Sequence, residues 1–403
     1  MKPVTTYWVR GTGRVLAAAL AARLADQGAA LAVTLVILAR THSPPLAGVV
    51  VGAFSFPALI TGPVIGAWLD RLSAKRVLFL VNQATLTVCL IAVGALAGHS
   101  PGIVLIMLGL AAGLTSPVIT GGFTSLIPLL VPRDRLIRAN VADSATYDLA
   151  GLAGPAMVAL AASVAGPAGG LAVVAGSSGA GIVLVLLAPM PPAPGTRSAE
   201  TVTQAVAGGM RLLTRKPLLA ATTAATTLAQ LPEGMLPVAL PLLAVAIGSR
   251  TSASGWLLTA ASAGALLGTT VSGRLIGALG PRAVMLAATA AGAPLLAALA
   301  VITSLTPGLV LAGLFGAATG PVLAATFTIR QREVPTGRYA QLATTAASLK
   351  TGAYAAGAAL TGIAVATIGV RSALLCAACI QLAAAVPAAL PLPRPADTQT
   401  GQP

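Results

Sequence analysis

Twelve apolar runs, each long enough to cross a bilayer, follow one another along this chain. A transmembrane helix needs about 20 consecutive apolar residues. The runs lie at about 15–40, 46–69, 77–98, 103–128, 139–164, 170–189, 217–248, 253–276, 283–304, 308–329, 339–366 and 371–392. Helices satisfy every backbone N–H and C=O internally, as hydrocarbon requires. The pattern predicts an all-α integral membrane protein with twelve transmembrane helices.

The composition supports a protein whose helices pack in lipid. Hydrophobic residues make up 56% of the 403 residues and charged residues only 8%, against roughly a quarter charged in soluble domains. Aromatic residues are scarce and glycine is abundant, so we expect the helices to meet through small residues. The net charge of +15 comes from dispersed Lys and Arg, without the basic stretches that bind nucleic acid.

The distribution of Lys and Arg predicts the orientation. If the N-terminus is cytoplasmic, the connections between runs on the opposite side carry only Arg40, Arg250 and Arg371. Such a bias places both termini and the central linker inside the cell. No small-residue cleavage site follows the first run, which we expect to be a retained helix. The Ala-rich, Lys-poor composition favours the cytoplasmic membrane of a bacterium.

Two halves of similar sequence flank one polar linker. We predict a six-helix bundle at 1–189, a cytoplasmic linker at 190–216 with an amphipathic interfacial helix starting near Ser198, and a second bundle at 217–403. A spacing of 207 residues aligns GAWLDRLSAKRVLFL at Gly66 with GRLIGALGPRAVMLA at Gly273, and also carries Asp26 onto Glu233. A third match joins VPRDR at 131 to VPTGR at 334. Three ordered matches indicate a duplication, which is common in transporters.

The loop after the second run resembles the signature GxLaDRxGRK of the major facilitator superfamily. The matching residues are Gly66, Leu69, Asp70, Arg71 and Lys75. Ser73 stands where the second signature glycine belongs, and Ala74 replaces a basic residue. The resemblance covers nearly the whole chain and implies the major facilitator fold of two pseudo-symmetric six-helix bundles. It also implies that Gly66, Asp70, Arg71 and Lys75 form a conformational switch; the alternative is a charge cluster that only sets topology.

The fifth run resembles the antiporter motif GxxxGPxxGG of the same superfamily. Gly154 and Pro155 match it, whereas Val158 and Ala159 replace the two final glycines. The stretches PLLVPRDRLIRAN and GMRLLTRKPLL are similar to loops of the bacterial drug and siderophore exporters. These resemblances imply export by antiport. A plain Gly-Pro helix kink would explain Gly154 and Pro155 nearly as well.

Ionisable residues deep in the runs are the candidates for the transport mechanism, because a buried charge is costly in a membrane. Asp26 and Glu233 are the foremost candidates, and Asp148 is intermediate in depth. A carboxylate removed from water favours its protonated form, so it can carry a proton until water or a cationic substrate arrives. Asp143 is only a few residues into its run, and we expect it to be solvated.

Both foremost acids have structural alternatives. Asp26 is three residues from Arg23 on one helix face, so the two could form an internal ion pair. Glu233 lies between Pro232 and Gly234, where a helix break would make room for its side chain. The alternative is that Glu233 lies near the outer end of its helix and is simply hydrated.

Lys350 stands alone about ten residues into the eleventh run and needs a partner. It could pair with an acid across the two halves, or bind an anionic group of the substrate. Cys376 and Cys379 have CxxC spacing within an apolar run, where packing is the expected role. No metal or other cofactor is expected.

These patterns together predict a monomeric, proton-coupled exporter of small amphiphilic organic molecules or drugs, with substrate, protons and lipid as its partners. Uptake or facilitated diffusion of a metabolite is the second transport hypothesis. A membrane-embedded enzyme would need a DxxD-type acid cluster, which the nine acidic residues do not form. A non-transporting scaffold would not need matched acids in both halves. ATP-driven pumping would need a GxxxxGK[ST] loop, which is absent.

Overall fold

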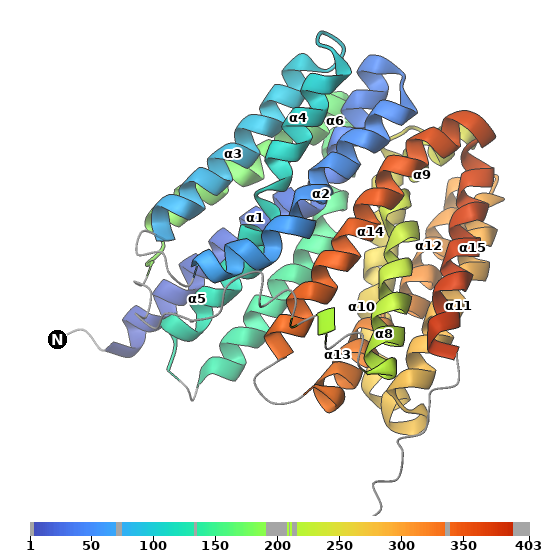
Figure 1. The fold of residues 1–403 in the computed structure, drawn as a ribbon. Coiled ribbons are helices and arrows are strands. Elements are labelled where there is room, and N and C mark those ends of the chain that lie inside the picture. Colours follow the sequence, from blue (N-terminus) through green and yellow to red (C-terminus); the bar gives the residue numbers. More distant parts are fainter. Residues whose placement is uncertain are drawn as a thin grey trace, which may run out of the picture.

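The computed structural model describes residues 4–69, 75–132, 135–190, 208, 210–211, 216–334 and 339–389. All regular structure in these ranges is helical (Figure 1). The first half contains α1 (Val4–Thr41), α2 (Pro44–Leu69), α3 (Lys75–Leu96), α4 (Gly102–Gly113), the π-helix η1 (Val118–Gly122), α5 (Phe123–Leu130) and α6 (Leu136–Leu187). The second half contains α8 (Pro217–Leu228), α9 (Gln230–Ala246), α10 (Ala253–Leu279), α11 (Pro281–Ala300), α12 (Leu305–Thr319), α13 (Pro321–Glu333), α14 (Tyr339–Ile368) and α15 (Val370–Ala389).

The described residues contain the twelve predicted crossings. Ten segments are long and apolar enough to span a membrane, and one of them, 142–187, holds two crossings. Its backbone leaves the helical region at Ala165 and Gly166, where Gly166 has φ of 70°. The chain then turns back, because Gly170 lies against Val158 of the preceding crossing. The 27-residue α10 is the twelfth crossing.

Proline explains the interruption at the start of the second half. Pro232 has no backbone N–H, and its ring clashes with the carbonyl of Leu228, four residues earlier. The helix α8 ends at Leu228, and α9 begins at Gln230. The break therefore comes just before Glu233, which lies in the first turn of α9 and near the middle of the span 217–246.

Hydrophobic cores form mainly within each half. One large cluster draws nearly all of its residues from α1–α6, while separate clusters gather residues of α8–α15. Similar contacts appear in both halves: Arg76 near the start of α3 donates to the Ala188 carbonyl after α6, and Arg282 near the start of α11 donates to the Ala388 carbonyl near the end of α15, both at 2.9 Å. The linker helix predicted from Ser198 lies largely outside the described residues, and the boundaries 1–189, 190–216 and 217–403 remain predictions.

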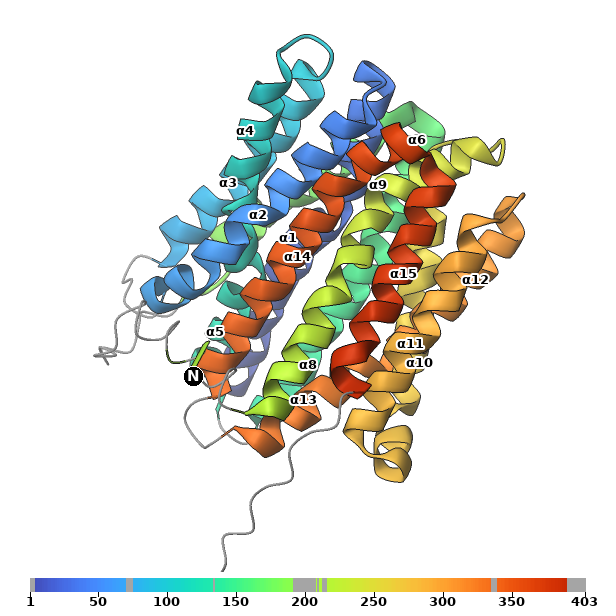
Figure 2. The same cartoon turned by 45° about the vertical axis from the view of Figure 1, so that its right-hand side comes forward.

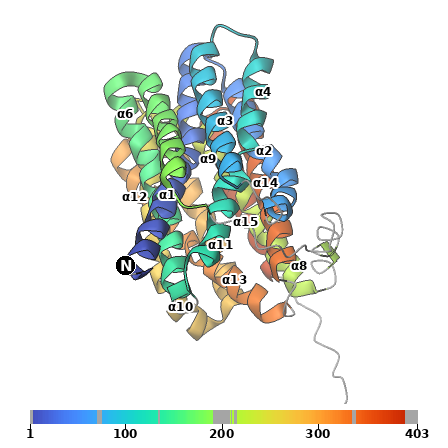
Figure 3. The same ribbon diagram turned by 90° about the vertical axis from the view of Figure 1, so that its left-hand side faces the viewer.

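Small residues join the halves at the end where α1 meets α2. There α2 packs on α14, and α6 packs on α10 (Figures 2 and 3). A methyl group added at Gly48 of α2 would lie 2.6 Å from the Ala358 carbonyl of α14, and one at Gly255 of α10 would lie 2.8 Å from the Pro155 carbonyl of α6. The first residues of α1 and the last of α15 lie at the opposite end (Figure 1).

Candidate functional site

Asp26 and Glu233 approach the same tyrosine from opposite halves. Tyr354 of α14 interacts electrostatically with both carboxylates. It is held there by close helix contact, because Gly234 of α9 packs directly against the Tyr354 backbone carbonyl. The repeat-related acids of α1 and α9 are therefore both close enough to Tyr354 to affect its electrostatic surroundings.

Asp26 does not form the salt bridge that its spacing from Arg23 suggested. The Arg23 guanidinium instead bonds to the Asp143 carboxylate, with an Nη1–Oδ1 distance of 2.8 Å. Arg23 and the nearby Ser116 hydroxyl both contribute to the electrostatic surroundings of Asp26. The Asp26 carboxylate is thus left outside the arginine salt bridge.

The expectation that Asp143 is solvated is wrong. Its side chain is 5% exposed and that of Arg23 is 2% exposed. Because α1, α5 and α6 pack together here, other groups enclose the pair. Thr124 donates to Asp143 Oδ2 at 2.7 Å, and the guanidinium carbon of Arg23 lies 3.5 Å from the ring centroid of Tyr147. The Tyr147 hydroxyl donates to the Thr120 carbonyl in η1.

Glu233 is bound within its own half. The Gln230 amide donates to its carboxylate at 2.6 Å. Lys350 of α14 interacts electrostatically with Glu233. Because Glu233 lies at mid-span and lines a cavity, it is not an outer-end residue. Lys350 therefore has an acidic neighbour in the same bundle and not across the halves.

A cavity of about 340 Å³ adjoins this group. Tyr147, Asp148 and Gly151 of α6 form one side, and all other lining residues belong to the second half. Besides Glu233 and Lys350, the lining contains many uncharged polar side chains. These are Thr226, Gln230, Ser262, Thr269, Thr289, Thr319, Thr326 and Gln381. Sequence reasoning missed these uncharged residues, since Ser, Thr and Gln are common within the apolar runs and only packing selects those that face the cavity.

The residues of the antiporter-like motif are helix-packing points. Gly154 lies against Gln27 and Gly28 of α1, and the Pro155 carbonyl lies against Gly255 of α10. The non-helical backbone within α6 occurs at Ala165 and Gly166, ten residues beyond this motif. The motif therefore holds α6 against one helix of each half.

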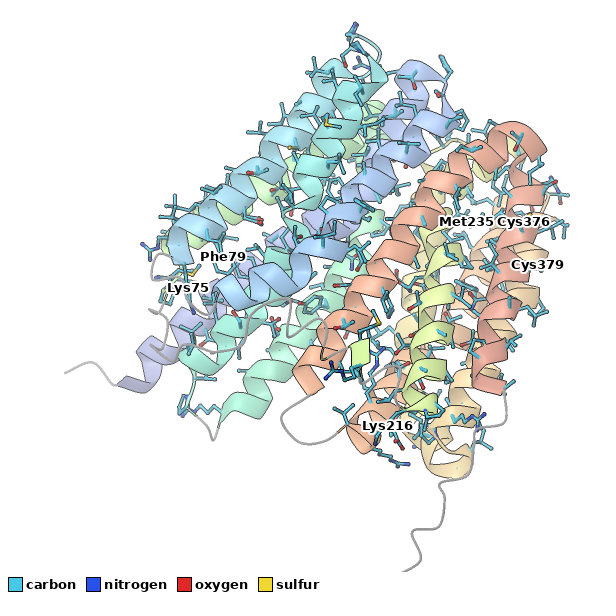
Figure 4. All side chains as sticks on the ribbon, viewed as in Figure 1. Lys75, Phe79, Lys216, Met235, Cys376 and Cys379 are labelled. Atoms are coloured by element: carbon cyan, nitrogen blue, oxygen red, sulfur yellow. The ribbon has the colours of Figure 1, made fainter. Side chains whose placement is uncertain are left out.

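The signature loop is only partly described. Asp70 and Arg71 lie outside the described residues, and Gly66 is in the last turn of α2. Lys75 begins α3 and is 3% exposed; it lies one turn from Phe79, at the lower end of that helix (Figure 4). The switch role of these residues remains a prediction.

Cys376 and Cys379 face outward from α15 (Figure 4). In a bilayer this surface meets lipid, and the two side chains are not part of the packed interior as expected. Among the described residues, no group of three or more His, Cys, Asp or Glu side chains could hold a metal ion.

Twelve membrane crossings in two related bundles, with ionisable groups and a polar cavity at mid-depth, define a membrane transporter. The family model of the Major Facilitator Superfamily matches residues 15–229 and 222–402. The chain belongs to this superfamily.

One similar protein is an uncharacterized MFS-type transporter, y4rN, of Sinorhizobium fredii. It is 30% identical over 368 residues, which cover 88% of each chain. Among solved structures, the nucleoside transporter NupG has a TM-score of 0.78 at 12% identity, covering 94% of this chain and 98% of its own. A bacterial homologue of the human lysosomal transporter Spinster, in an inward-facing, unoccupied conformation, has a TM-score of 0.75 at 15% identity, covering 96% and 97%. A POT family transporter in complex with 5-aminolevulinic acid has a TM-score of 0.70 at 14% identity, covering 94% and 95%. At these identities the solved structures share the fold alone.

Proposed function

We propose that this chain is a proton-coupled exporter that moves small amphiphilic organic molecules, drugs among them, out of the cell. The observation that carries the proposal is that Asp26 and Glu233 lie at mid-depth in their spans and both interact electrostatically with Tyr354. Matched acids in the two halves are suited to proton coupling, because each can exchange a proton when the surrounding helices let water in from one side.

The surroundings of the two acids suggest different roles. Asp26 lies near the Ser116 hydroxyl, while the neighbouring arginine is bound to Asp143. Glu233 has Lys350 nearby and lines the cavity. We assign proton coupling first to Asp26, and substrate contact linked to protonation to Glu233, with Asp148 as a further substrate contact. Protonation of Glu233 would remove the counter-charge of Lys350 and free its ammonium for another partner.

The proposed orientation identifies the side of the membrane to which the structure is closed. The Lys and Arg bias supports both termini being cytoplasmic, with the protein in the bacterial cytoplasmic membrane. The end at which α2 packs on α14 would then be external, and the halves would be closed to the outside. In this state the substrate would enter from the cytoplasm. We propose that a single chain is the transporting unit.

Uptake or facilitated diffusion is the second candidate, since the structural neighbours include a nucleoside transporter and a POT family transporter in complex with 5-aminolevulinic acid. The antiporter-like Gly154 and Pro155 favour exchange over uptake. The family and its neighbours are transporters, which argues against a membrane-embedded enzyme.

Proton movement in inside-out vesicles tests the proposal. An imposed pH gradient is followed with a fluorescent dye while lipophilic, cationic and anionic compounds are added one at a time. We expect at least one compound to trigger proton efflux with the wild type, and none with Asp26→Asn at equal protein levels. Equilibration of a labelled compound without proton movement would contradict proton coupling and support a facilitator. Unimpaired proton-linked transport by Asp26→Asn would remove Asp26 from the mechanism.

A further inference from the structure

The polar wall of the cavity is rich in hydrogen-bond acceptors. The hydroxyl groups of Thr226, Thr269, Thr319 and Thr326 donate to carbonyls one turn back in their own helices, at 2.7–2.9 Å. Their hydrogens are occupied, while their oxygen lone pairs can still accept from a bound molecule. A ligand that matches this wall must therefore bring donors of its own.

Gln381 provides a buried acceptor that lacks a partner. The side chain is 2% exposed and lines the cavity from α15. Its amide nitrogen donates to the Thr289 carbonyl of α11 at 3.1 Å. This contact fixes which end of the amide carries the hydrogens, and the Oε1 atom is left without a hydrogen-bond partner. An unpaired buried acceptor is destabilising, and a donor on a ligand would remove that cost.

The first half contains a comparable contact that is complete. There Gln83 of α3 donates to the Ser178 carbonyl of α6, and Gln83 Oε1 accepts from Asn82 at 3.4 Å. The spacing of the third sequence match, 203 residues, carries Ser178 onto Gln381, and the spacing of 207 carries Asn82 onto Thr289. The same helix pair thus has a satisfied glutamine in one half and an open one in the other. The unpaired Oε1 atom of Gln381 is therefore specific to the helix pair that lines the cavity and is not shared by the helix pair of the first half.

The charges at the cavity favour a cation. Asp148 and Glu233 are the acidic lining residues, and Lys350 is the basic one. Lys350 interacts with Glu233 and also with the Arg330 cation of α13, which does not line the cavity. Within the described chain the Asp148 carboxylate has no hydrogen bond or ion pair, so it can receive a positive group. Leu266, Val322 and Leu323 offer apolar surface for a carbon skeleton.

We propose that the cavity binds a small amine that carries further N–H or O–H donors, with its ammonium group at Asp148 and another donor at Gln381 Oε1. The proposal rests on the proposed function in one respect, since it takes this cavity as the substrate site. The cavity volume of about 340 Å³ limits the ligand to the small end of the pocket range of roughly 300–1,000 Å³.

Equilibrium binding to the purified full-length protein in detergent, without a proton gradient, tests the ligand class. Glucosamine and spermidine are the donor-rich amines; glucose has donors without charge, tetraphenylphosphonium has charge without donors, and glucuronate is an anion. We expect both amines to bind more tightly than the other three compounds. Equal or tighter binding of tetraphenylphosphonium or glucuronate, or no binding of either amine, would overturn the proposal.

Variants test the two contacts. Gln381→Met should raise the Kd of the amines about fivefold without lowering the melting temperature of the unliganded protein, since it removes an unpaired acceptor. The control Gln83→Met, on the corresponding helix pair of the first half, should lower the melting temperature and leave the Kd unchanged. Asp148→Asn replaces an exposed side chain by one of similar shape, and it should raise the Kd about tenfold or more. An unchanged Kd in both Asp148→Asn and Gln381→Met would overturn the assignment.

The outcomes separate this inference from the proposed function. Amine binding without proton movement in vesicles would contradict proton-coupled export and leave the ligand class standing. Proton movement triggered only by compounds that lack donors, with no amine binding, would contradict the ligand class alone.

Discussion

The substitution Asp143→Asn should destabilise the protein strongly, although it changes few atoms. The salt bridge that it breaks has an N–O distance of 2.8 Å between side chains that are 2% and 5% exposed. Asparagine keeps one oxygen that can accept from Arg23 and Thr124, but it has no negative charge. The Arg23 cation is then left buried without a salt bridge, with the Tyr147 ring and the Asp26 carboxylate as its remaining electrostatic partners. Removing one partner of a buried pair costs about 3–5 kcal/mol, and we expect a loss of unfolding free energy in that range.

Unfolding by titration with sodium dodecyl sulfate in mixed micelles, followed by tryptophan fluorescence, measures this loss. Asp26→Asn is the matched control, because it removes the carboxylate that is closer to Arg23 in sequence but outside the salt bridge. Its effect should stay below about 1 kcal/mol. In the double variant Arg23→Met with Asp143→Leu, both charges are absent, and much of the lost stability should return because a buried pair can often be replaced by apolar residues.

Two results would refute this reasoning. If Asp143→Asn and Asp26→Asn were equally destabilising, Arg23 would not be committed to Asp143. If the double variant were no more stable than Asp143→Asn alone, the cost would come from lost packing and not from an uncompensated charge. Either result would also weaken the assignment of Asp26 as an acid outside the arginine salt bridge.

Three further substitutions test helix packing and conformational switching. Gly316→Ala should lower the melting temperature, because its methyl group would overlap the α10 backbone. The control Gly313→Ala should be tolerated, because its methyl group would lie 3.6 Å from the Ala260 carbonyl. Gly48→Ala should favour separation of α2 from α14, which double electron–electron resonance between spin labels on the two helices would detect; an unchanged distance distribution would contradict a role in closure. Asp70→Asn should slow transport while ligand binding is retained, and unchanged turnover would reduce the signature loop to a topological signal.

The crossings and two of the acids could be predicted because their signals are local. Apolar runs separated by short polar breaks mark the helices, and a carboxylate within such a run stands out. Asp26 and Glu233 were also linked by the repeat, and the structure brings both near Tyr354. Even the helix break before Glu233 follows from the proline at 232.

Partner assignments could not be predicted, because they depend on distant segments. Arg23 is three residues from Asp26, yet its salt bridge is with Asp143, 120 residues away. The sequence offered only the pair on one helix face, whereas the packing of α6 on α1 supplies the stronger partner. The burial of Asp143 has the same origin: it is close to the start of α6, but neighbouring helices cover it.

The duplication explains why the cavity lies mostly in one half. Scaffold contacts are kept in both halves, as the Arg76 and Arg282 bonds to helix ends illustrate. Polar contacts inside the bundles have diverged: Gln83 is satisfied by Asn82, whereas Gln381 leaves an acceptor open beside the cavity. Since a satisfied network rigidifies a core and an open acceptor demands a ligand, this divergence lets one half act as a rigid support while the other recognises substrate. On this argument, substitutions at Gln83 and Gln381 should separate stability from affinity, although both side chains occupy the same helix pair of the repeat.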